Sequence, residues 1–174
     1  MDDTLPHTAS SETANSETAN SETVDYVAIT RLQNAYADAV TRRAWAEFHG
    51  MFLADAPVRV DTVTNPVIAL TGPQEVGDFI GTAVERFEFF EFVPLSTRVF
   101  LRVGGDADRA TARLYICELR QDAASGHATQ AFGVYQDDYR RVDGRWWFAA
   151  RAYQSLARSG RGEVFEFPAE AFPV

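Results

Sequence analysis

The stretch FGVYQDDYRRVDGRWWFAARAY, from Phe132 to Tyr153, decides how this chain folds. In it, two runs with aromatic and β-branched residues at alternate positions flank the turn Val142-Asp143-Gly144-Arg145. Asp-Gly between such runs is a strong hairpin signal, because a type I′ turn needs positive φ and glycine adopts it without steric cost. We therefore predict two antiparallel strands joined at Asp143-Gly144.

Alternation gives each predicted strand two faces. One face of the first strand carries Gly133, Tyr135, Asp137, Tyr139 and Arg141. In the second strand, one face carries Trp147, Ala149, Arg151 and Tyr153, and the other carries Trp146, Phe148, Ala150 and Ala152. A wall that mixes large aromatic rings with Asp and Arg suits a pocket with polar tips, so the functional interpretation starts at this hairpin.

Composition narrows the class of protein. A chain of 174 residues is most simply one domain, and its net charge of −9 argues against nucleic acid or an anionic membrane as the partner. All sixteen basic side chains are Arg, which leaves no lysine for Schiff-base chemistry.

Cys117 is the single cysteine and no Cys or His residues have metal-ligand spacing, so we expect no metal. Without a signal peptide or an apolar spanning segment, the expected location is the cytoplasm.

The two ends of the chain differ from its middle. Residues 1–23 contain the degenerate repeat SSETA, NSETA, NSETV, which is too polar to offset the entropy of ordering, so we predict a disordered tail. The functional alternative is a tether or an interaction tail. The domain is expected over residues 24–158. In the final segment, residues 159–174, Phe165, Phe167 and Phe172 are too apolar for a free tail. They cover either a pocket, a sheet edge or a subunit interface.

The expected order of elements is ααββαββββ. Helical spacing of apolar residues predicts helices over residues 24–40 and 44–53, and Gly72-Pro73 opens a third helix up to about residue 87. Alternation predicts strands over residues 57–63, 67–71, 96–103 and 110–121, and from residue 128 into the hairpin. Helices packed on one face of a curved, mostly antiparallel sheet form an α+β cone, whose mouth is a natural ligand site.

Short motifs in a fixed order resemble a known family. They are Tyr36-Ala37-Asp38-Ala39 before Trp45, Val58-Arg59-Val60-Asp61, Gly105-Asp106 before Ala110-Thr111-Ala112, and Gly133-x-Tyr135-x-Asp137 leading to Asp143-Gly144-Arg145-Trp146 and Arg151. Over residues 25–172 the chain resembles the SnoaL-like and scytalone-dehydratase-like branch of the nuclear transport factor 2-like (NTF2-like) superfamily. The resemblance implies an NTF2-like cone in which three helices from the N-terminal side and the curved sheet form a pocket.

The resemblance also implies a function. Members of this kind are cofactor-independent lyases, isomerases or cyclases that act by acid–base chemistry on small cyclic, polyketide- or terpenoid-like substrates. We therefore expect a small hydrophobic or aromatic ligand, no cofactor, and a homodimer or homotrimer. The alternative is a non-catalytic module of the same fold that binds a hydrophobic ligand or assembles an oligomer.

The chain departs from the dehydratase pattern at the positions that move protons. In that branch, an Asp near the end of the first helix and two His on the sheet activate a water. The resemblance aligns these positions with Thr41, with residues 94–96 and with residues 117–119, none of which is Asp or His. This departure favours the non-catalytic alternative, and it requires any catalyst to use other residues.

Three residues are candidates for catalysis. Tyr36 matches, by resemblance, a position where ketosteroid isomerases carry an oxyanion-stabilising Tyr; the alternative is a core Tyr. Asp61, on the first predicted strand, is a general base if the cone desolvates it and a solvated strand-end residue otherwise. Asp137 is either an acid–base group or half of a structural ion pair with Arg151.

Other residues are candidates for binding the substrate. Tyr135, Arg151 and Tyr153 are placed toward the pocket by the resemblance. The further candidates are Tyr115, Trp45, His49 and, on the aromatic tail, Phe167. Alternation puts Glu118 on the face opposite Tyr115 and Cys117. If it is buried there, it must pair with an arginine, for which Arg98 and Arg102 on the adjoining strand are the candidates; otherwise it belongs to a solvated ladder of charges.

Overall fold

The computed structural model describes residues 9–160 and 162–166. Its elements, in chain order, are α1 (Ala9–Arg42), η1 (Trp45–Gly50), β1 (Pro57–Asp61), β2 (Ile68–Thr71), α2 (Gly72–Val84), β3 (Phe87–Leu101), η2 (Val103–Gly105), β4 (Arg109–Asp122), β5 (Ala128–Val142), β6 (Arg145–Arg158) and β7 (Glu163–Val164), where η marks a 3₁₀ helix.

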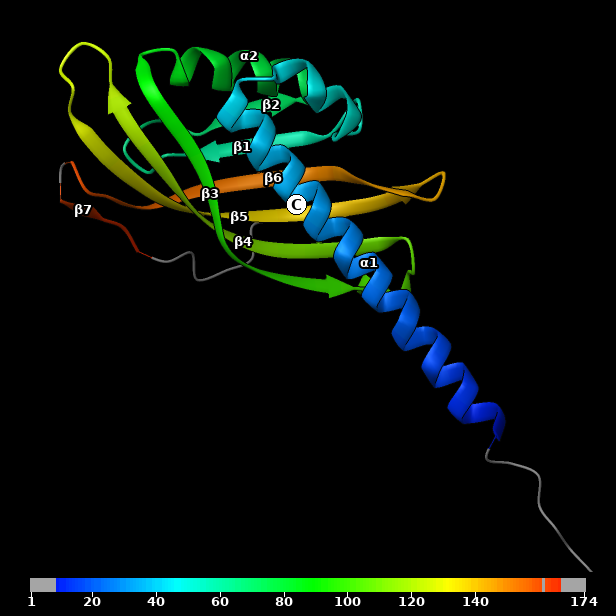
Figure 1. Cartoon of the computed structure of the whole chain (residues 1–174). Coiled ribbons are helices and arrows are strands. Elements are labelled where there is room, and N and C mark those ends of the chain that lie inside the picture. Colours follow the sequence, from blue (N-terminus) through cyan, green and yellow to red (C-terminus); the bar gives the residue numbers. More distant parts are fainter. Residues whose placement is uncertain (1–8, 161, 167–174) are drawn as a thin grey trace, which may run out of the picture.

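One curved sheet forms the body of the molecule. Its strand order is β2-β1-β6-β5-β4-β3, and β7 pairs with the end of β6. The pairs are antiparallel except β1 with β6, which is parallel. Helix α1 crosses one face of the sheet and α2 covers the same face near β1 and β2 (Figure 1). The predicted α+β cone is confirmed.

The predicted hairpin is present. Asp143 has φ 51° and Gly144 has φ 75°, as both central residues of a type I′ turn require. Trp146 and Phe148, however, lie on the same face as Arg151, whereas strict alternation separates them: the Arg151 guanidinium carbon lies 4.6 Å from the Phe148 ring centroid. The cause is a bulge, because Asp138 pairs with Ala150 and Tyr139 with Phe148, which leaves Ala149 as an extra residue.

Helix α1 is longer than the sequence pattern predicts. It begins at Ala9, so residues 9–23, for which we predicted disorder, continue the helix in the structure. The repeat contains Ala and Glu, which favour helix, and it extends a helix already nucleated by its packed part. From residue 18 onward, Asp25 is the first buried residue of α1, and the N-terminal part of the helix projects beyond the sheet (Figure 1). The predicted domain boundaries stay predictions.

Two other elements differ from the prediction. The helix expected over residues 44–53 is only the 3₁₀ turn η1, because the chain then pairs with the sheet. The Met51 carbonyl accepts a hydrogen bond from the Phe148 N–H (2.9 Å), and the Leu53 N–H donates to the Phe148 carbonyl (3.0 Å). The aromatic run that starts at Phe87 belongs to β3 and buries the rings of Phe87, Phe90 and Phe92.

The core lies between the helices and the concave face of the sheet. At its centre, the Tyr36 ring stacks on Phe48 with centroids 5.1 Å apart and meets Phe92 and Phe148 edge-on. None of the helices in the described part of the chain is both long enough and apolar enough to cross a membrane.

Candidate active site

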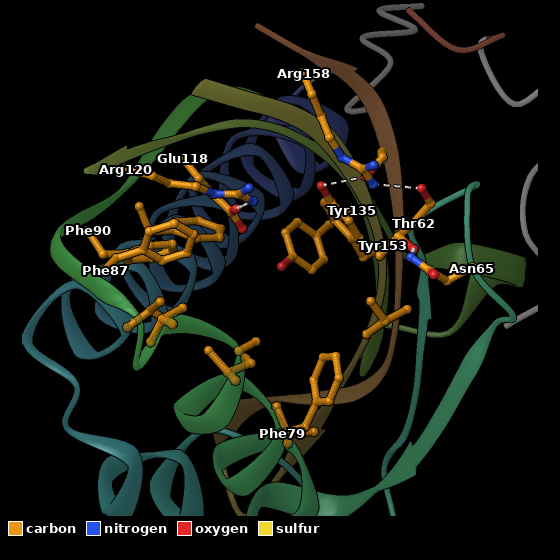
Figure 2. A pocket seen from close by; sticks show the side chains of 18 of the residues that line it. Thr62, Asn65, Phe79, Phe87, Phe90, Glu118, Arg120, Tyr135, Tyr153 and Arg158 are labelled. Carbon is orange, nitrogen blue, oxygen red and sulfur yellow. Dashed lines mark hydrogen bonds and ion pairs between the residues drawn. The ribbon is translucent and has the colours of Figure 1, made fainter. Parts of the chain in front are cut away.

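A cavity of about 430 Å³ lies between α1, α2 and the concave face of the sheet (Figure 2). Its volume falls in the range of small-molecule sites. Its apolar lining residues include Val58, Val76, Phe79, Ile80, Phe87, Phe90 and Phe92. The polar lining residues are Tyr36, Thr62, Thr64, Asn65, Arg86, Glu118, Arg120, Thr129, Gln130, Tyr135, Arg151, Tyr153, Ser155 and Arg158.

A buried guanidinium forms one polar end of the cavity. The guanidinium carbon of Arg151 lies 4.0 Å from the ring centroid of Tyr36 and 3.8 Å from that of Tyr135. Its side chain is 1% exposed, and neither Nη1 nor Nη2 has a hydrogen-bond partner among the described residues. Unpaired N–H groups of a buried cation are costly, and an oxygen atom of a ligand in the cavity would satisfy them.

A polar chain supports Arg151 from behind. Asp137, which does not line the cavity, places Oδ1 3.0 Å from Nε of Arg151, and its Oδ2 accepts a hydrogen bond from the Tyr139 hydroxyl (2.8 Å). The Tyr139 oxygen in turn accepts one from Nε2 of Gln33 on α1 (3.0 Å). These contacts link the helix to β5 and β6 and orient the guanidinium.

The tyrosines around Arg151 are held in their protonated form. Burial raises the pKa of Tyr36, although the charge of Arg151 opposes this, and burial also raises the pKa of Tyr135 well above its ordinary value. For Arg151, burial lowers the pKa but the charge of Asp137 and the nearby tyrosines outweigh it, so that the pKa is raised. At neutral pH this end therefore presents phenol donors and a permanent cation to a ligand oxygen.

The opposite wall carries a second charged pair. Glu118 on β4 lies across the cavity from Tyr153 and Thr62 (Figure 2). Its Oε2 pairs with Arg120, not with the Arg98 or Arg102 that we considered, and its side chain is 15% exposed. The sequence pattern puts Glu118 on the face opposite Tyr115. Alternation along β4 was the available signal, but it does not say which face is concave.

Arg158, which lines the cavity, connects three segments of the chain around it. It donates hydrogen bonds to the Thr62 carbonyl (2.7 Å), Thr64 Oγ1 (3.1 Å) and Ser155 Oγ (3.2 Å), and it pairs with Glu163 of β7 (3.3 Å). The loop after β1 is thereby joined to β6 and to the C-terminal segment.

The predicted site residues divide into two groups. Tyr36, Tyr135, Arg151 and Tyr153 line the cavity together, and Asp137 lies directly behind Arg151. Four others do not line it: Asp61, Tyr115, Trp45 and His49. Phe167 lies outside the described residues.

Each of the four residues outside the cavity has other surroundings. Oδ1 of Asp61 accepts a hydrogen bond from the Val63 N–H (2.8 Å). Trp45 packs on Phe48 and α2, and His49 is exposed with Nε2 3.4 Å from Gln74. Tyr115 is on the convex face, because its neighbour Ile116 shares the concave face with Glu118.

At the position where the resemblance implies a catalytic Asp, Thr41 has a backbone contact. Its Oγ1 accepts a hydrogen bond from the Phe92 N–H (3.0 Å), which ties α1 to β3. No cluster of three or more His, Cys, Asp or Glu side chains with metal-binding geometry occurs within residues 9–160 and 162–166.

Comparisons with known proteins agree with the fold. The chain is similar to a candidate scytalone dehydratase from Novosphingobium aromaticivorans DSM 12444, at 16% identity and a TM-score of 0.69 over 87% of this chain and 94% of that one. It is also similar to the hexachlorocyclohexane dehydrochlorinase LinA-type3 from Novosphingobium barchaimii LL02, at 19% identity and a TM-score of 0.71 over 86% and 99%. Identities this low show a shared fold. A search of curated proteins finds no significant match.

A family model is more specific than these structural neighbours. The model of the SnoaL-like domain matches residues 21–152, which is well over half of the chain. The matched range runs from α1 to β6 and includes the cavity residues Tyr36, Glu118, Tyr135 and Arg151. The chain therefore belongs to the SnoaL-like family of the NTF2-like fold.

Proposed function

We propose that this protein is a cofactor-independent enzyme that moves a proton on a small cyclic substrate of polyketide- or terpenoid-like character, with a lyase, isomerase or cyclase outcome. The observation that carries the proposal is the Arg151 guanidinium, buried at the cavity with Nη1 and Nη2 unpaired among the described residues. The fold shared with a dehydrochlorinase and a candidate scytalone dehydratase agrees with this class of chemistry.

The chemistry follows from the donors at this end of the cavity. Removing a proton from carbon next to a carbonyl places negative charge on the carbonyl oxygen. The phenols of Tyr36 and Tyr135 and the guanidinium of Arg151 are donors fixed in place before the charge develops, and all three side chains are buried. The aromatic rings in the lining of the cavity suit a flat, apolar ring system.

Exchange of hydrogen for deuterium tests the proposal without the natural substrate. 2-Tetralone, a cyclic ketone with acidic α-hydrogens, is incubated with the full-length protein in D₂O, and loss of the α-proton signal is followed by NMR. We expect the wild type to accelerate exchange, and Y135F and R151Q each to slow it by about 10²–10³-fold, as removal of an oxyanion donor does. Binding of 2-naphthol, followed by its fluorescence, shows whether the cavity is intact.

The alternative function is binding without catalysis, and the absence of Asp and His at the family positions favours it. If the protein only binds ligands, 2-tetralone binds and displaces 2-naphthol, and its α-hydrogens exchange at the rate measured in buffer alone. That outcome would refute the proposed catalytic function and support binding without catalysis.

The homodimer or homotrimer is likewise a proposal. Leu95 and Phe100 on the edge strand β3 are 55% and 41% exposed, as expected of residues that a second copy covers. Sedimentation velocity at micromolar concentration should show a dimer or trimer, and a stable monomer would contradict this.

A further inference from the structure

We propose that Glu118 is the catalytic base of the cavity, and that the substrate is an enolisable cyclic ketone whose carbonyl oxygen binds at Arg151. This inference rests on the proposed function and assigns its missing proton acceptor. Among the described carboxylates, Glu118 is the one in the cavity lining. The two carboxylates proposed from the sequence do not line it: Asp61 lies at the end of β1, and Asp137 lies behind Arg151.

The backbone register directs Glu118 inward. Glu118 is paired with Phe92 on one side and Ala131 on the other, and both of these neighbours are buried. Leu114 and Ile116, which precede it at alternate positions on β4, are buried in the same concave face. The carboxylate is therefore placed by the sheet, which holds a side chain more firmly than a loop does.

One oxygen of Glu118 is held and the other remains for a ligand. Oε2 pairs with the Arg120 guanidinium, which fixes the orientation of the carboxylate. Arg120 in turn lies over the Phe87 ring, with its guanidinium carbon 5.5 Å from the ring centroid. Oε1 is the oxygen that this pair leaves for a proton of the substrate.

The charge of Glu118 acts on the same tyrosines that surround the proposed oxyanion site. It contributes to the raised pKa of Tyr36 and of Tyr135, and after burial it is the largest contribution to the pKa of Tyr153, about 12. Glu118, Arg151 and all three tyrosines line the same cavity. In the proposed binding mode, the oxygen of the ligand lies at Arg151 and its ring lies toward Glu118.

The step balances without a cofactor. Glu118 takes a proton from the carbon next to the carbonyl, and the C–H electron pair forms the carbon–carbon double bond of an enolate, with the negative charge on the oxygen at Arg151. The carboxylic acid of Glu118 then returns the proton. In a β,γ-unsaturated ketone the enolate charge extends to the γ-carbon, and return of the proton there completes an isomerisation. Where the β-carbon carries a hydroxyl, the enolate electron pair forms a carbon–carbon double bond to that carbon, its C–O bond breaks, and the proton of Glu118 goes to the departing hydroxide, which leaves as water.

The test compares E118Q with E88Q in the 2-tetralone exchange assay. Glu88 is an exposed carboxylate on β3 outside the cavity lining, so E88Q makes the same chemical change without touching the cavity. We expect E118Q to lower the exchange rate by about 10²-fold or more, E118D to keep part of the activity, and E88Q to match the wild type. Binding of 2-naphthol by E118Q should persist.

Loss of the Glu118 charge leaves Arg120 without its partner. A loss of exchange in E118Q alone could therefore come from misfolding. The double variant E118Q/R120Q removes both charges and keeps similar volumes, and it should fold, bind 2-naphthol and lack exchange. Full exchange in either folded variant would overturn the assignment of Glu118. Absence of exchange in the wild type would instead refute the proposed function, so the two failures are distinguishable.

Discussion

Nε of Arg151 lies 3.0 Å from Oδ1 of Asp137, and the two side chains are 1% and 0% exposed. A pair so deeply buried is costly to break, because the remaining charge has no water to solvate it. Burial raises the pKa of Asp137 while the charge of Arg151 lowers it, which shows the two opposing effects at one carboxylate.

We expect D137N to reduce the free energy of unfolding by about 3–5 kcal/mol, because it leaves the Arg151 cation buried and unpaired. The matched control is D106N, which removes a surface carboxylate from its pair with Arg140, where both partners are nearly half exposed. That change should cost less than about 1 kcal/mol. Urea unfolding measures both variants. If both variants lost the same free energy of unfolding, burial would not make the Arg151–Asp137 pair more stabilising than the surface pair.

Alkaline pH should destabilise the protein through its buried tyrosines. The pKa of Tyr153 is raised from 10.0 to about 12, so the folded state keeps a proton that the unfolded state loses. Its contribution to stability is complete below pH 10.0 and is lost as the pH rises toward about 12, at about 1.4 kcal/mol per pH unit. In urea unfolding across this range, Y153F should show a shallower decline than the wild type, and parallel declines would contradict the shift.

Gly133 leaves room for the ring of Tyr153. A Cβ at this position would lie 2.2 Å from Cε2 of Tyr153 and 2.7 Å from its hydroxyl oxygen, so the ring would have to move. We expect G133A to reduce stability by about 1–3 kcal/mol and to weaken 2-naphthol binding. In a Y153A background the same change should cost almost nothing. An equal cost in both backgrounds would place the effect in the backbone of β5.

Removing residues 1–20 should leave stability unchanged within about 0.5 kcal/mol, because Thr18, Ala19 and Asn20 are exposed in the part of α1 that precedes its contact with the domain. Asp25 marks where the helix joins the domain. Its Oδ1 accepts a hydrogen bond from Trp146 Nε1 (3.0 Å) and pairs with Arg141 (2.7 Å). D25A should therefore cost about 1–3 kcal/mol in a thermal or urea melt. A truncated chain as unstable as D25A would show that the repeat packs on the domain.

Local chemistry explains which parts of the structure were predictable. The turn at Asp143-Gly144 depends on two residues that adopt positive φ, and the periodic runs around it depend on nearest neighbours. Tyr135, Arg151 and Tyr153 were placed together on this basis and on the family resemblance, and all three line the cavity. The bulge at Ala149 was not predictable, because it is defined by pairing between strands, and it reverses the faces of Trp146 and Phe148.

The hairpin, the mostly antiparallel sheet and the α+β class follow from the sequence, because turn chemistry and hydrophobic alternation act over a few residues. Alternation also predicts that Glu118 lies opposite Tyr115 on its strand. Three features emerge from the folded chain alone: the Glu118 face is concave, Asp137 lies behind Arg151, and Asp61 is outside the cavity. The physical reason is that alternation fixes relative faces within one strand, whereas sheet curvature and cross-strand register decide which face encloses the ligand.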